Sequence, residues 1–325
     1  MLIIEKSGLL TSIQDLGRYG FKKYGIITGG AMDPLSHRMA NLLVQNHENE
    51  PTIEMTLYGP TIRFLENTIV SLCGGNLSPS LNGRPMQMAS PIHIQKGDVL
   101  TFGQPKTGCR AYLAIRGGIK IPKVMGSYST YLRAQIGGFK GRPLQKGDHL
   151  GAGPLKLERD VISTKWFASN LLHIEPEGRK KVRVLKGRHF EEFTKRSIDA
   201  FSKQSYKISP QSDRMGYRLD GVSLELFKQK EIISEAVTFG TIQVPANGKP
   251  IILMADSQTI GGYPKIAEVI SVDLPVVAQA KPGDSLQFEF VTLDEAQQLY
   301  INQEKQLKIL KRGIGMKFNK GKQYV

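Results

Sequence analysis

The stretch from Ser234 to Asp284 constrains the fold most, because short strand-like runs alternate there with turn residues. The run IILM is apolar, and the run TIQV is rich in β-branched residues. Gly, Pro, Asn or Asp separates such runs from one another. Short apolar runs bounded by turn residues are typical of β-strands. We therefore expect this part of the chain to be built from strands and tight turns.

The same pattern fills the chain between Pro51 and Gly153. A Lys-Gly-Asp or Pro-Gly-Asp turn followed by a strand-like run occurs three times, at 94–102, 144–152 and 280–288. Its presence in both halves hints at two related β domains. Strands are expected at Thr61–Phe64, Thr68–Leu72, Ile92–Ile94, Val99–Phe102 and Ala111–Ile115.

A few helices are expected around this β framework. The first begins at Asp33, a favourable N-cap followed by proline, and closes near Asn46. The second lies within Arg188–Gln204, where Phe and Ile recur at helical spacing. The third begins with a capping box at Thr292 and stops at Gly313.

The domain organisation follows from length and from one break in the pattern. A chain of 325 residues has room for about two ordinary domains. The more polar segment Lys156–Lys181 interrupts the alternation of strand-like runs with turn residues. The sequence therefore predicts an N-terminal β-rich domain over residues 1–160. A C-terminal β-barrel domain with a final helix and a basic tail would cover residues 161–325.

Composition narrows the class of protein. Hydrophobic residues make up 40% and charged residues 22%, as in a soluble globular chain. No apolar run approaches the roughly 18 residues of a membrane span, and the N-terminus has no secretory signal, so no membrane partner is expected. The two cysteines, Cys73 and Cys109, do not make a disulfide framework and favour a reduced, cytoplasmic setting.

The formal net charge of +15 suggests an anionic partner. Seven basic residues and no acid lie in the last 21 residues, which leaves the body near +8 (15 − 7). The other Lys and Arg residues are scattered, so nucleic-acid binding is disfavoured. An acidic partner protein or a small anionic substrate explains the charge as well.

Three polar, glycine-punctuated loops are the candidates for a binding site. They are Thr11–Arg18 with its continuation Gly29–Asp33, then Ser212–Arg218, and Gln258–Pro264. Glycine pairs let backbone N–H groups approach an anion, and an Arg beside Asp and Gly can grip a carboxylate or phosphate. Each loop taken alone is better explained as an ordinary turn with a solvated Arg. Three of them on one β scaffold favour a shared pocket.

Several common sites are missing from the sequence. It has no phosphate-binding loop of the G-x-x-x-x-G-K-[ST] type, no H-E-x-x-H and no G-x-S-x-G. The six histidines are isolated from one another along the chain, so no metal site is predicted.

The loop segments resemble a known family. TSIQDLGRYG, GGAMDPLSHRMANLLVQN, the segment Gly126–Asp148, SDRMGYRL and ADSQTIGGYPKIAEVISVDL resemble the C component of the bacterial ATP-dependent 5-oxoprolinases. The same family contains allophanate-hydrolase-subunit-2 proteins, the KipA antagonist proteins and part of the carboxyltransferase region of urea carboxylase. The resemblance runs from about Ile3 to Phe290. It implies a mainly β fold with two cyclophilin-like β-barrel domains and a few peripheral helices.

The resemblance also implies a function in a complex. The partners would be a sister component of related fold (the KipI-like B component) and a separate A component. With ATP, and with Mg²⁺, the complex would open the lactam of 5-oxo-L-proline to give L-glutamate. No covalent biotin is expected on this chain. Two alternatives stay open: a biotin-dependent carboxyltransferase acting on urea or a similar amide, and a KipA-like regulator that binds a kinase inhibitor.

The candidate residues would divide the work of the reaction. Arg214 would offset phosphate and oxyanion charge, and Glu235 and Asp256 would serve as acid–base or metal-binding groups. The remaining candidates would bind the substrate: Gln14, Asp15, Arg18, Asp33, Met215, Gly216, Gln243, Gln258, Thr259, Gly261, Gly262 and Tyr263.

Overall fold

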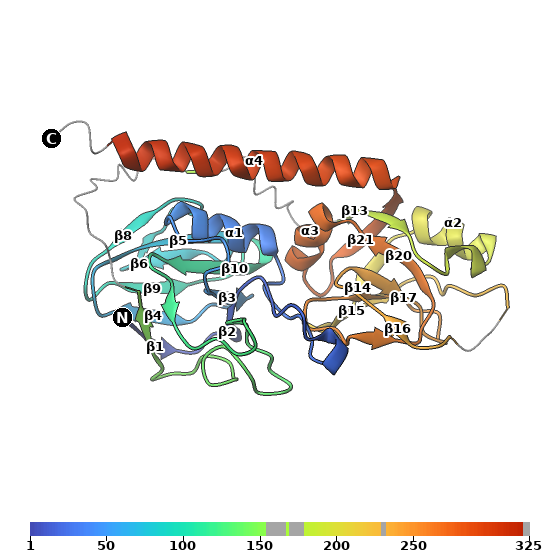
Figure 1. Cartoon of the computed structure of the whole chain (residues 1–325), viewed down its shortest axis with the longest axis horizontal. Helices are drawn as coiled ribbons and strands as arrows, with labels where there is room; N and C mark the ends of the chain where they lie inside the picture. Colours follow the sequence, from blue (N-terminus) through green and yellow to red (C-terminus); the bar gives the residue numbers. More distant parts are fainter. Residues whose placement is uncertain (154–166, 169–178, 229–231, 321–325) are drawn as a thin grey trace. The chain divides into compact units, whose positions relative to one another are not determined.

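A computed structural model describes residues 1–153, 167–168, 179–228 and 232–320. The chain divides into two compact units (Figure 1). The first unit contains Met1–Arg18, Asp33–Ile174 and Glu304–Val325, and the second contains Tyr19–Met32 and Glu175–Gln303. The predicted boundary between residues 160 and 161 lies outside the described residues.

The first unit is built on two antiparallel sheets among its described residues. One has the strand order β11-β12-β1-β4-β9-β6-β7, and the other has the order β2-β3-β10-β5-β8. Inward-facing Ile, Leu, Val and Met residues of both sheets form one core cluster. The strands are β1 (Leu2–Lys6), β2 (Leu10–Gln14), β3 (Thr52–Thr56), β4 (Thr61–Phe64), β5 (Thr68–Asn76), β6 (Pro79–Leu81), β7 (Arg84–Pro85), β8 (Ile92–Ile94), β9 (Val99–Phe102), β10 (Thr107–Ile115), β11 (Ile119–Lys120) and β12 (His149–Ala152).

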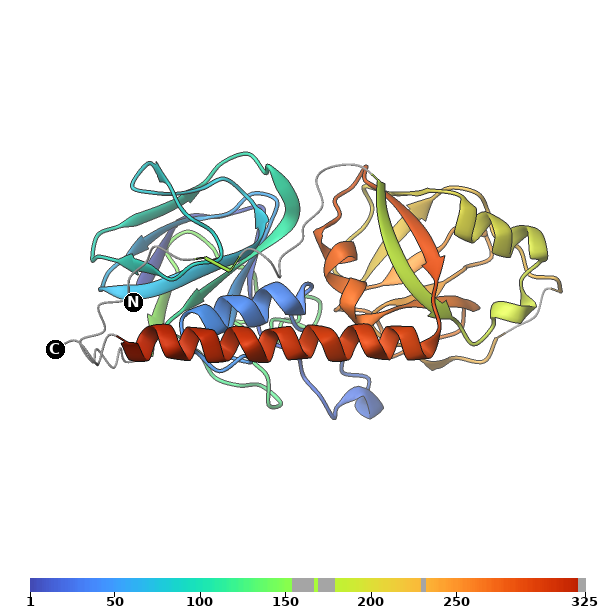
Figure 2. The ribbon, with the colours of Figure 1, turned by 90° about the horizontal axis from the view of Figure 1, so that it is seen from above.

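Helix α1 (Pro34–Leu43) packs against β5 and β10 in the first unit (Figure 2). The Asp33 side chain accepts a hydrogen bond from the backbone N–H of Ser36, which confirms the predicted N-cap. The helix ends at Leu43, before the predicted closure near Asn46. Asn46 still contributes there, because its backbone N–H donates to the carbonyl oxygen of Asn41.

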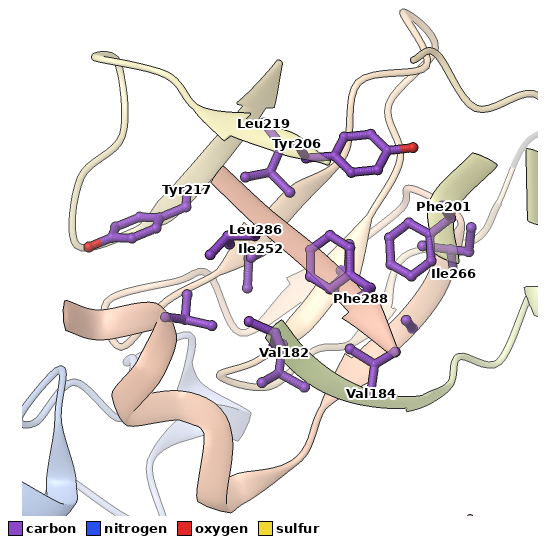
Figure 3. Close-up of a cluster of buried hydrophobic side chains, with 14 of the residues drawn as sticks. Val182, Val184, Phe201, Tyr206, Tyr217, Leu219, Ile252, Ile266, Leu286 and Phe288 are labelled. Atoms are coloured by element: carbon purple, nitrogen blue, oxygen red, sulfur yellow. The ribbon is translucent and has the colours of Figure 1, made fainter. Parts of the chain in front are cut away.

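The second unit contains a closed barrel with the strand order β13-β20-β17-β18-β15-β14-β21. The side chains shown in Figure 3 fill its interior, and the rings of Phe201 and Phe288 stack with their centroids 4.5 Å apart. A separate two-stranded ribbon pairs β16 with β19. The strands are β13 (Arg179–Lys186), β14 (Tyr206–Ile208), β15 (Gly216–Asp220), β16 (Glu235–Ala236), β17 (Thr241–Gln243), β18 (Ile251–Leu253), β19 (Ile260–Gly261), β20 (Lys265–Val269) and β21 (Ser285–Phe290).

Two helices of the second unit differ in how well the sequence predicts them. Helix α2 (Lys195–Lys203) lies within the predicted range, where the Thr194 side chain caps it, and Phe190–Glu192 forms a separate 3-10 turn before it. The short α3 (Leu274–Gln279), in the second unit, was not predicted from the sequence.

The last helix, α4 (Leu293–Lys320), begins at the predicted capping box. The backbone N–H of Glu295 donates to the Thr292 hydroxyl, and the backbone N–H of Thr292 donates to the Glu295 carboxylate. The predicted stop at Gly313 is wrong. A glycine inside a helix costs only about 1 kcal/mol relative to alanine. The buried Ile314 just beyond it favours continuation of the helix.

All three Gly-Asp turns have the same local structure. Gly97, Gly147 and Gly283 have φ angles of 97°, 89° and 96°, which only glycine adopts readily. In each turn the Asp carboxylate accepts the backbone N–H three residues earlier, at 2.8, 2.8 and 3.2 Å. Each turn leads directly into a strand, namely β9, β12 and β21. The mainly β fold predicted from the sequence is confirmed.

Candidate functional site

The predicted site residues are divided between the two units. Gln14, Asp15, Arg18 and Asp33 belong to the first unit. All the others belong to the second unit: Arg214, Met215, Gly216, Glu235, Gln243, Asp256, Gln258, Thr259, Gly261, Gly262 and Tyr263.

In the first unit, Asp15 follows the last residue of β2 and is fully buried. Its Oδ1 accepts hydrogen bonds from the hydroxyls of Ser127 and Ser129, and from the backbone N–H of Gly17. Its Oδ2 accepts the backbone N–H of Tyr128 at 2.7 Å. Neutral donors thus surround the carboxylate and satisfy both of its oxygens.

Arg18 and Gln14 hold the same segment of the first unit from the other side. The Arg18 guanidinium donates to the carbonyl oxygens of Val124 and Ser129, both at 2.9 Å. The Gln14 amide donates to the carbonyl oxygen of Thr130 at 3.3 Å. Together with Asp15 these side chains fix residues 124–130. Asp33 acts locally, as the cap of α1.

In the second unit, Arg214 and Asp256 form a buried ion pair. The guanidinium Nε and Nη2 donate to the two carboxylate oxygens at 2.8 and 2.9 Å. Nη2 also donates to the carbonyl oxygen of Gly30 at 2.6 Å. The backbone N–H of Asp256 donates to the carbonyl oxygen of Arg214. The bond from Arg214 to Gly30 joins the second predicted loop to the continuation of the first. Bidentate pairing fixes the orientation of both side chains.

A second charged cluster lies where the β16–β19 ribbon meets β20. Oε1 of Glu235 accepts a hydrogen bond from the Lys265 ammonium at 2.7 Å, and Oε2 accepts one from Arg188. The hydrogen bond from Lys265 is the main cause that lowers the pKa of Glu235. His189 Nε2 lies 3.7 Å from the same carboxylate. Glu235 therefore presents an ionised carboxylate whose side chain stays 22% exposed.

The tautomer of His189 follows from its hydrogen bonds. The backbone N–H of Lys265 donates to His189 Nδ1 at 3.2 Å, so Nδ1 acts as an acceptor. In the neutral ring the proton then lies on Nε2, which faces Glu235. The cluster can therefore accept a proton at Glu235 and offer donors from Lys265 and His189.

The residues near this cluster include Thr259 and Gly261 of the third predicted loop. Gly261 pairs with Glu235 in the ribbon, and its Cα lies against the amide of Gln243. Gln243 is buried, and its Nε2 has no hydrogen-bond partner among the described residues. The carbonyl oxygen of Thr259 accepts the backbone N–H of Val237.

The remaining predicted residues lie nearby in the chain and more openly. Tyr263 is 48% exposed, whereas Gln258 and Gly262 are half-buried. Met215 and Gly216 follow Arg214 into β15, and their backbone N–H groups donate to the Asp213 carboxylate. The hydrogen bonds that these residues make do not indicate a contact with a ligand.

Sequence reasoning missed Lys265, Arg188 and His189. Strand pairing brings them together. β13 ends just before Arg188 and His189 and pairs with β20, which begins at Lys265, while β16 with Glu235 pairs with β19. The signal available in the sequence was Lys265 itself, a cation placed directly after the third loop. A lysine at the start of an apolar strand-like run calls for a carboxylate partner when it is buried.

Three further observations limit the functions that the described residues can support. Across residues 1–153, 167–168, 179–228 and 232–320, no group of three His, Cys, Asp or Glu side chains is arranged to hold a metal ion. Burial raises the pKa of the Cys73 thiol, which disfavours the reactive thiolate. In the same described part of the chain, no helix is long and apolar enough to cross a membrane.

Comparison with known proteins identifies close relatives. The chain is 39% identical to the C component of 5-oxoprolinase from Haemophilus influenzae over 94% of this chain and 96% of that protein. It is 40% identical to the C component of 5-oxoprolinase from Escherichia coli over 91% of this chain and 93% of that protein. The crystal structure of the K. lactis urea amidolyase matches with a TM-score of 0.88 and 31% identity. That match covers 95% of this chain but only 20% of the amidolyase.

The family comparison agrees with these relatives. Residues 24–290 match the family described as carboxyltransferase domain, subdomain A and B. This match includes Arg214, the ribbon carrying Glu235, and the whole barrel of the second unit. The chain therefore belongs to the carboxyltransferase domain family of subdomains A and B.

Proposed function

We propose that this chain is the C component of an ATP-dependent 5-oxoprolinase and acts only within a complex. The observation that carries this proposal is the identity of 39% to a 5-oxoprolinase C component, extending over nearly the full length of both proteins. The partners would be a sister component of related fold and a separate A component, in the cytoplasm.

The proposed reaction is the opening of the 5-oxo-L-proline lactam to L-glutamate. A lactam carbonyl is a poor electrophile, so transfer of a phosphoryl group from ATP to its oxygen would create a leaving group. Water would attack the activated carbon, and the ring C–N bond would break as the nitrogen takes a proton to become the amine. A second water would then release phosphate from the resulting acyl phosphate and leave L-glutamate. Positive charge must offset the phosphate and oxyanion charge that develops. No residue of this chain is assigned to ATP or Mg²⁺ in this reaction.

The cluster around Glu235 supplies groups suited to part of this chemistry. An ionised carboxylate that stays partly open can accept a proton from attacking water. The Lys265 ammonium and the His189 Nε2–H group can hold the carboxylate in place. The lactam amide would form hydrogen bonds with the side chains of Gln243, Gln258, Thr259 and Tyr263. Gly261 and Gly262 would let the substrate approach the backbone closely. Arg214 and Asp256 would act together, since each orients the other.

A second function is favoured by one observation. The fold matches the K. lactis urea amidolyase with a TM-score of 0.88. A biotin-dependent carboxyl transfer to a urea-like amide would use the same side chains to form hydrogen bonds with the amide. It would require biotin on a partner, because no biotin attachment is assigned to this chain.

Reconstitution tests the proposal directly. The chain is mixed with its two partner proteins, ATP and 5-oxo-L-proline, and glutamate is measured. We expect glutamate only when all three proteins are present. Glu235→Gln should reduce the rate at least about 10²-fold, the usual contribution of a general base. Glu191→Gln, which removes the exposed partner of Lys186, serves as the matched control and should leave the rate unchanged.

The contrary outcomes are distinct. Formation of glutamate in a mixture that lacks this chain would show that the chain is not a component of the enzyme. Carboxyl transfer from a biotinylated partner to urea, with no glutamate formed, would favour the second function. Full activity of both Glu235→Gln and Arg214→Ala would remove these residues from the catalytic group.

A further inference from the structure

The second unit contains a surface hollow that no part of the proposed reaction has used. It has a volume of about 400 Å³ and is lined by Tyr19, Gly20, Lys22, Lys23 and Thr28. This volume lies within the range of small-molecule sites. All its lining residues come from the loop Tyr19–Met32, the blue segment that carries a short helix in Figure 1.

The loop is fastened to the barrel unit at several points. The buried Arg214 donates to the carbonyl oxygen of Gly30 at 2.6 Å. Lys22 Nζ donates to the carbonyl oxygen of Val237, one residue beyond β16, at 3.2 Å. Met32 lies fully buried in the barrel core. These contacts fix the hollow as part of the second unit and place it beside the ribbon that carries Glu235.

The hollow is electropositive. Between Tyr19 and Met32 the chain has no Asp or Glu, and it has Lys22 and Lys23. Neither lysine has a carboxylate partner among the described residues. Lys22 uses one of its three N–H donors on Val237, and Lys23 Nζ lies 5.0 Å from the centre of the Tyr24 ring. Both ammonium groups therefore keep donors for an anion.

The hollow also offers a flat apolar contact and a hydroxyl. Tyr19 lines it and is 72% exposed. Thr28 can donate or accept a hydrogen bond through its hydroxyl. An aromatic ring beside two ammonium groups suits a ligand that is charged at one end and planar at the other.

We propose that this hollow binds a small organic anion with a planar group. Its carboxylate or phosphate meets Lys22 and Lys23, and its planar part lies against Tyr19. The identity of the anion rests on the proposed function, whose two anionic reactants are 5-oxo-L-proline and ATP. The carboxylate of the first and the phosphates of the second share the chemistry that two lysines recognise.

Calorimetric titration of the full chain tests the site. 5-Oxo-L-proline and ATP with Mg²⁺ are titrated separately, at two ionic strengths. We expect saturable binding of one of them, weaker at the higher salt concentration. The double variant Lys22→Gln/Lys23→Gln should bind at least about tenfold more weakly, because two charge-assisted contacts are lost. Tyr19→Ala should also weaken binding, and Tyr19→Phe should not.

The matched control removes two other exposed lysines of the same unit, Lys195→Gln/Lys207→Gln. It carries the same charge change and should bind like the unaltered chain. Absence of saturable binding of both ligands, or equal weakening in both double variants, would overturn the proposal. Reconstituted glutamate formation is read separately. A chain that forms glutamate in the complex but binds neither reactant loses only this site and keeps its proposed function.

Discussion

Two buried arginines, Arg18 in the first unit and Arg214 in the second, show how one sequence signature leads to two structures. Both follow an Asp within three residues, lie near glycine, and were predicted to grip an anion. Both are almost inaccessible, with exposures of 0% and 4%. Arg18 donates to the carbonyl oxygens of Val124 and Ser129, whereas Arg214 donates to the Asp256 carboxylate.

The difference lies in how opposite charges are used. In the first unit, Asp15 and Arg18 hold the same segment through its hydroxyls, N–H groups and carbonyls. In the second unit, Arg214 and Asp256 hold each other, and the guanidinium also holds the loop at Gly30. A buried charge can thus be satisfied by neutral dipoles or by a counter-charge. The two cases respond differently to mutation.

The largest effect is expected from breaking the ion pair of the second unit. Asp256→Ala leaves the Arg214 guanidinium buried without its carboxylate. Loss of one partner of a buried pair costs about 3–5 kcal/mol. Hydrogen exchange of the backbone amides of β15 and β18 measures the free energy of opening of this region. This free energy should fall by the same amount.

The control for this change is an exposed pair in the same unit. Lys249 and Asp220 lie 2.9 Å apart with side chains about half exposed. Asp220→Ala should change the same amides little, because solvent screens exposed pairs. An Asp256→Ala protein as stable as the Asp220→Ala protein would show that the buried pair does not hold this unit together.

A glycine substitution gives the next largest effect, in the first unit. Gly137 has a φ angle of 68°, and a Cβ there would collide with the carbonyl oxygen of Ser129, the group that Arg18 binds. A backbone carbonyl group cannot move aside as easily as the end of a flexible side chain can. Gly137→Ala should destabilise the first unit by about 2–4 kcal/mol from left-handed strain and overpacking. Urea denaturation measures this, with Gly126→Ala as control, since its φ is similarly positive at 76° but its Cβ site is open.

The pH dependence of the first unit provides a third test. Burial lowers the pKa of His37 to about 4, and the nearby Asp15 carboxylate partly opposes that shift. The unfolded chain takes up this proton near pH 6.5, before the folded chain does. Stability from this group is therefore complete above about pH 6.5 and is lost as the pH falls towards 4, by about 3 kcal/mol in all.

An NMR titration of the His37 ring checks this value and its link to Asp15. Asp15→Asn removes the charge that raises the pKa of His37, so the ring should protonate at still lower pH in that variant. Protonation of His37 near pH 6.5 in the folded chain would contradict the assignment of a buried neutral ring.

Much of the fold could be predicted because local chemistry specifies it. The three Gly-Asp turns need a glycine in the left-handed conformation and an Asp acceptor, and both residues can be identified in the amino-acid sequence. The strands Thr61–Phe64, Ile92–Ile94 and Val99–Phe102 were predicted with their observed bounds. The end of α4 was predicted wrongly, because burial of Ile314 outweighs the local signal of Gly313.

The site could be predicted only in part, because it depends on strand pairing. Glu235 was predicted as an acid–base or metal-binding group, and Gly261 and Gln243 as substrate-binding residues. The ribbon brings the three together. Lys265 and His189 were missed, since their contact with Glu235 spans 30 and 46 positions of the chain. Pairing register at that separation is a property of the folded barrel.

The smallest effect, and the sharpest comparison with Gly137, is expected at Gly261 in the second unit. A Cβ there would lie 2.5 Å from Nε2 of Gln243, which is the end of a side chain. Gly261→Ala should therefore cost only about 1 kcal/mol, at the mild end of overpacking. Gln243→Ala in the same chain should remove the clash, so that the double variant is more stable than the two separate losses predict. Urea denaturation of the four proteins gives this coupling. Strict additivity would mean that the Gln243 amide is not held against Gly261. A loss as large as that of Gly137→Ala would mean that this side chain is fixed as firmly as backbone.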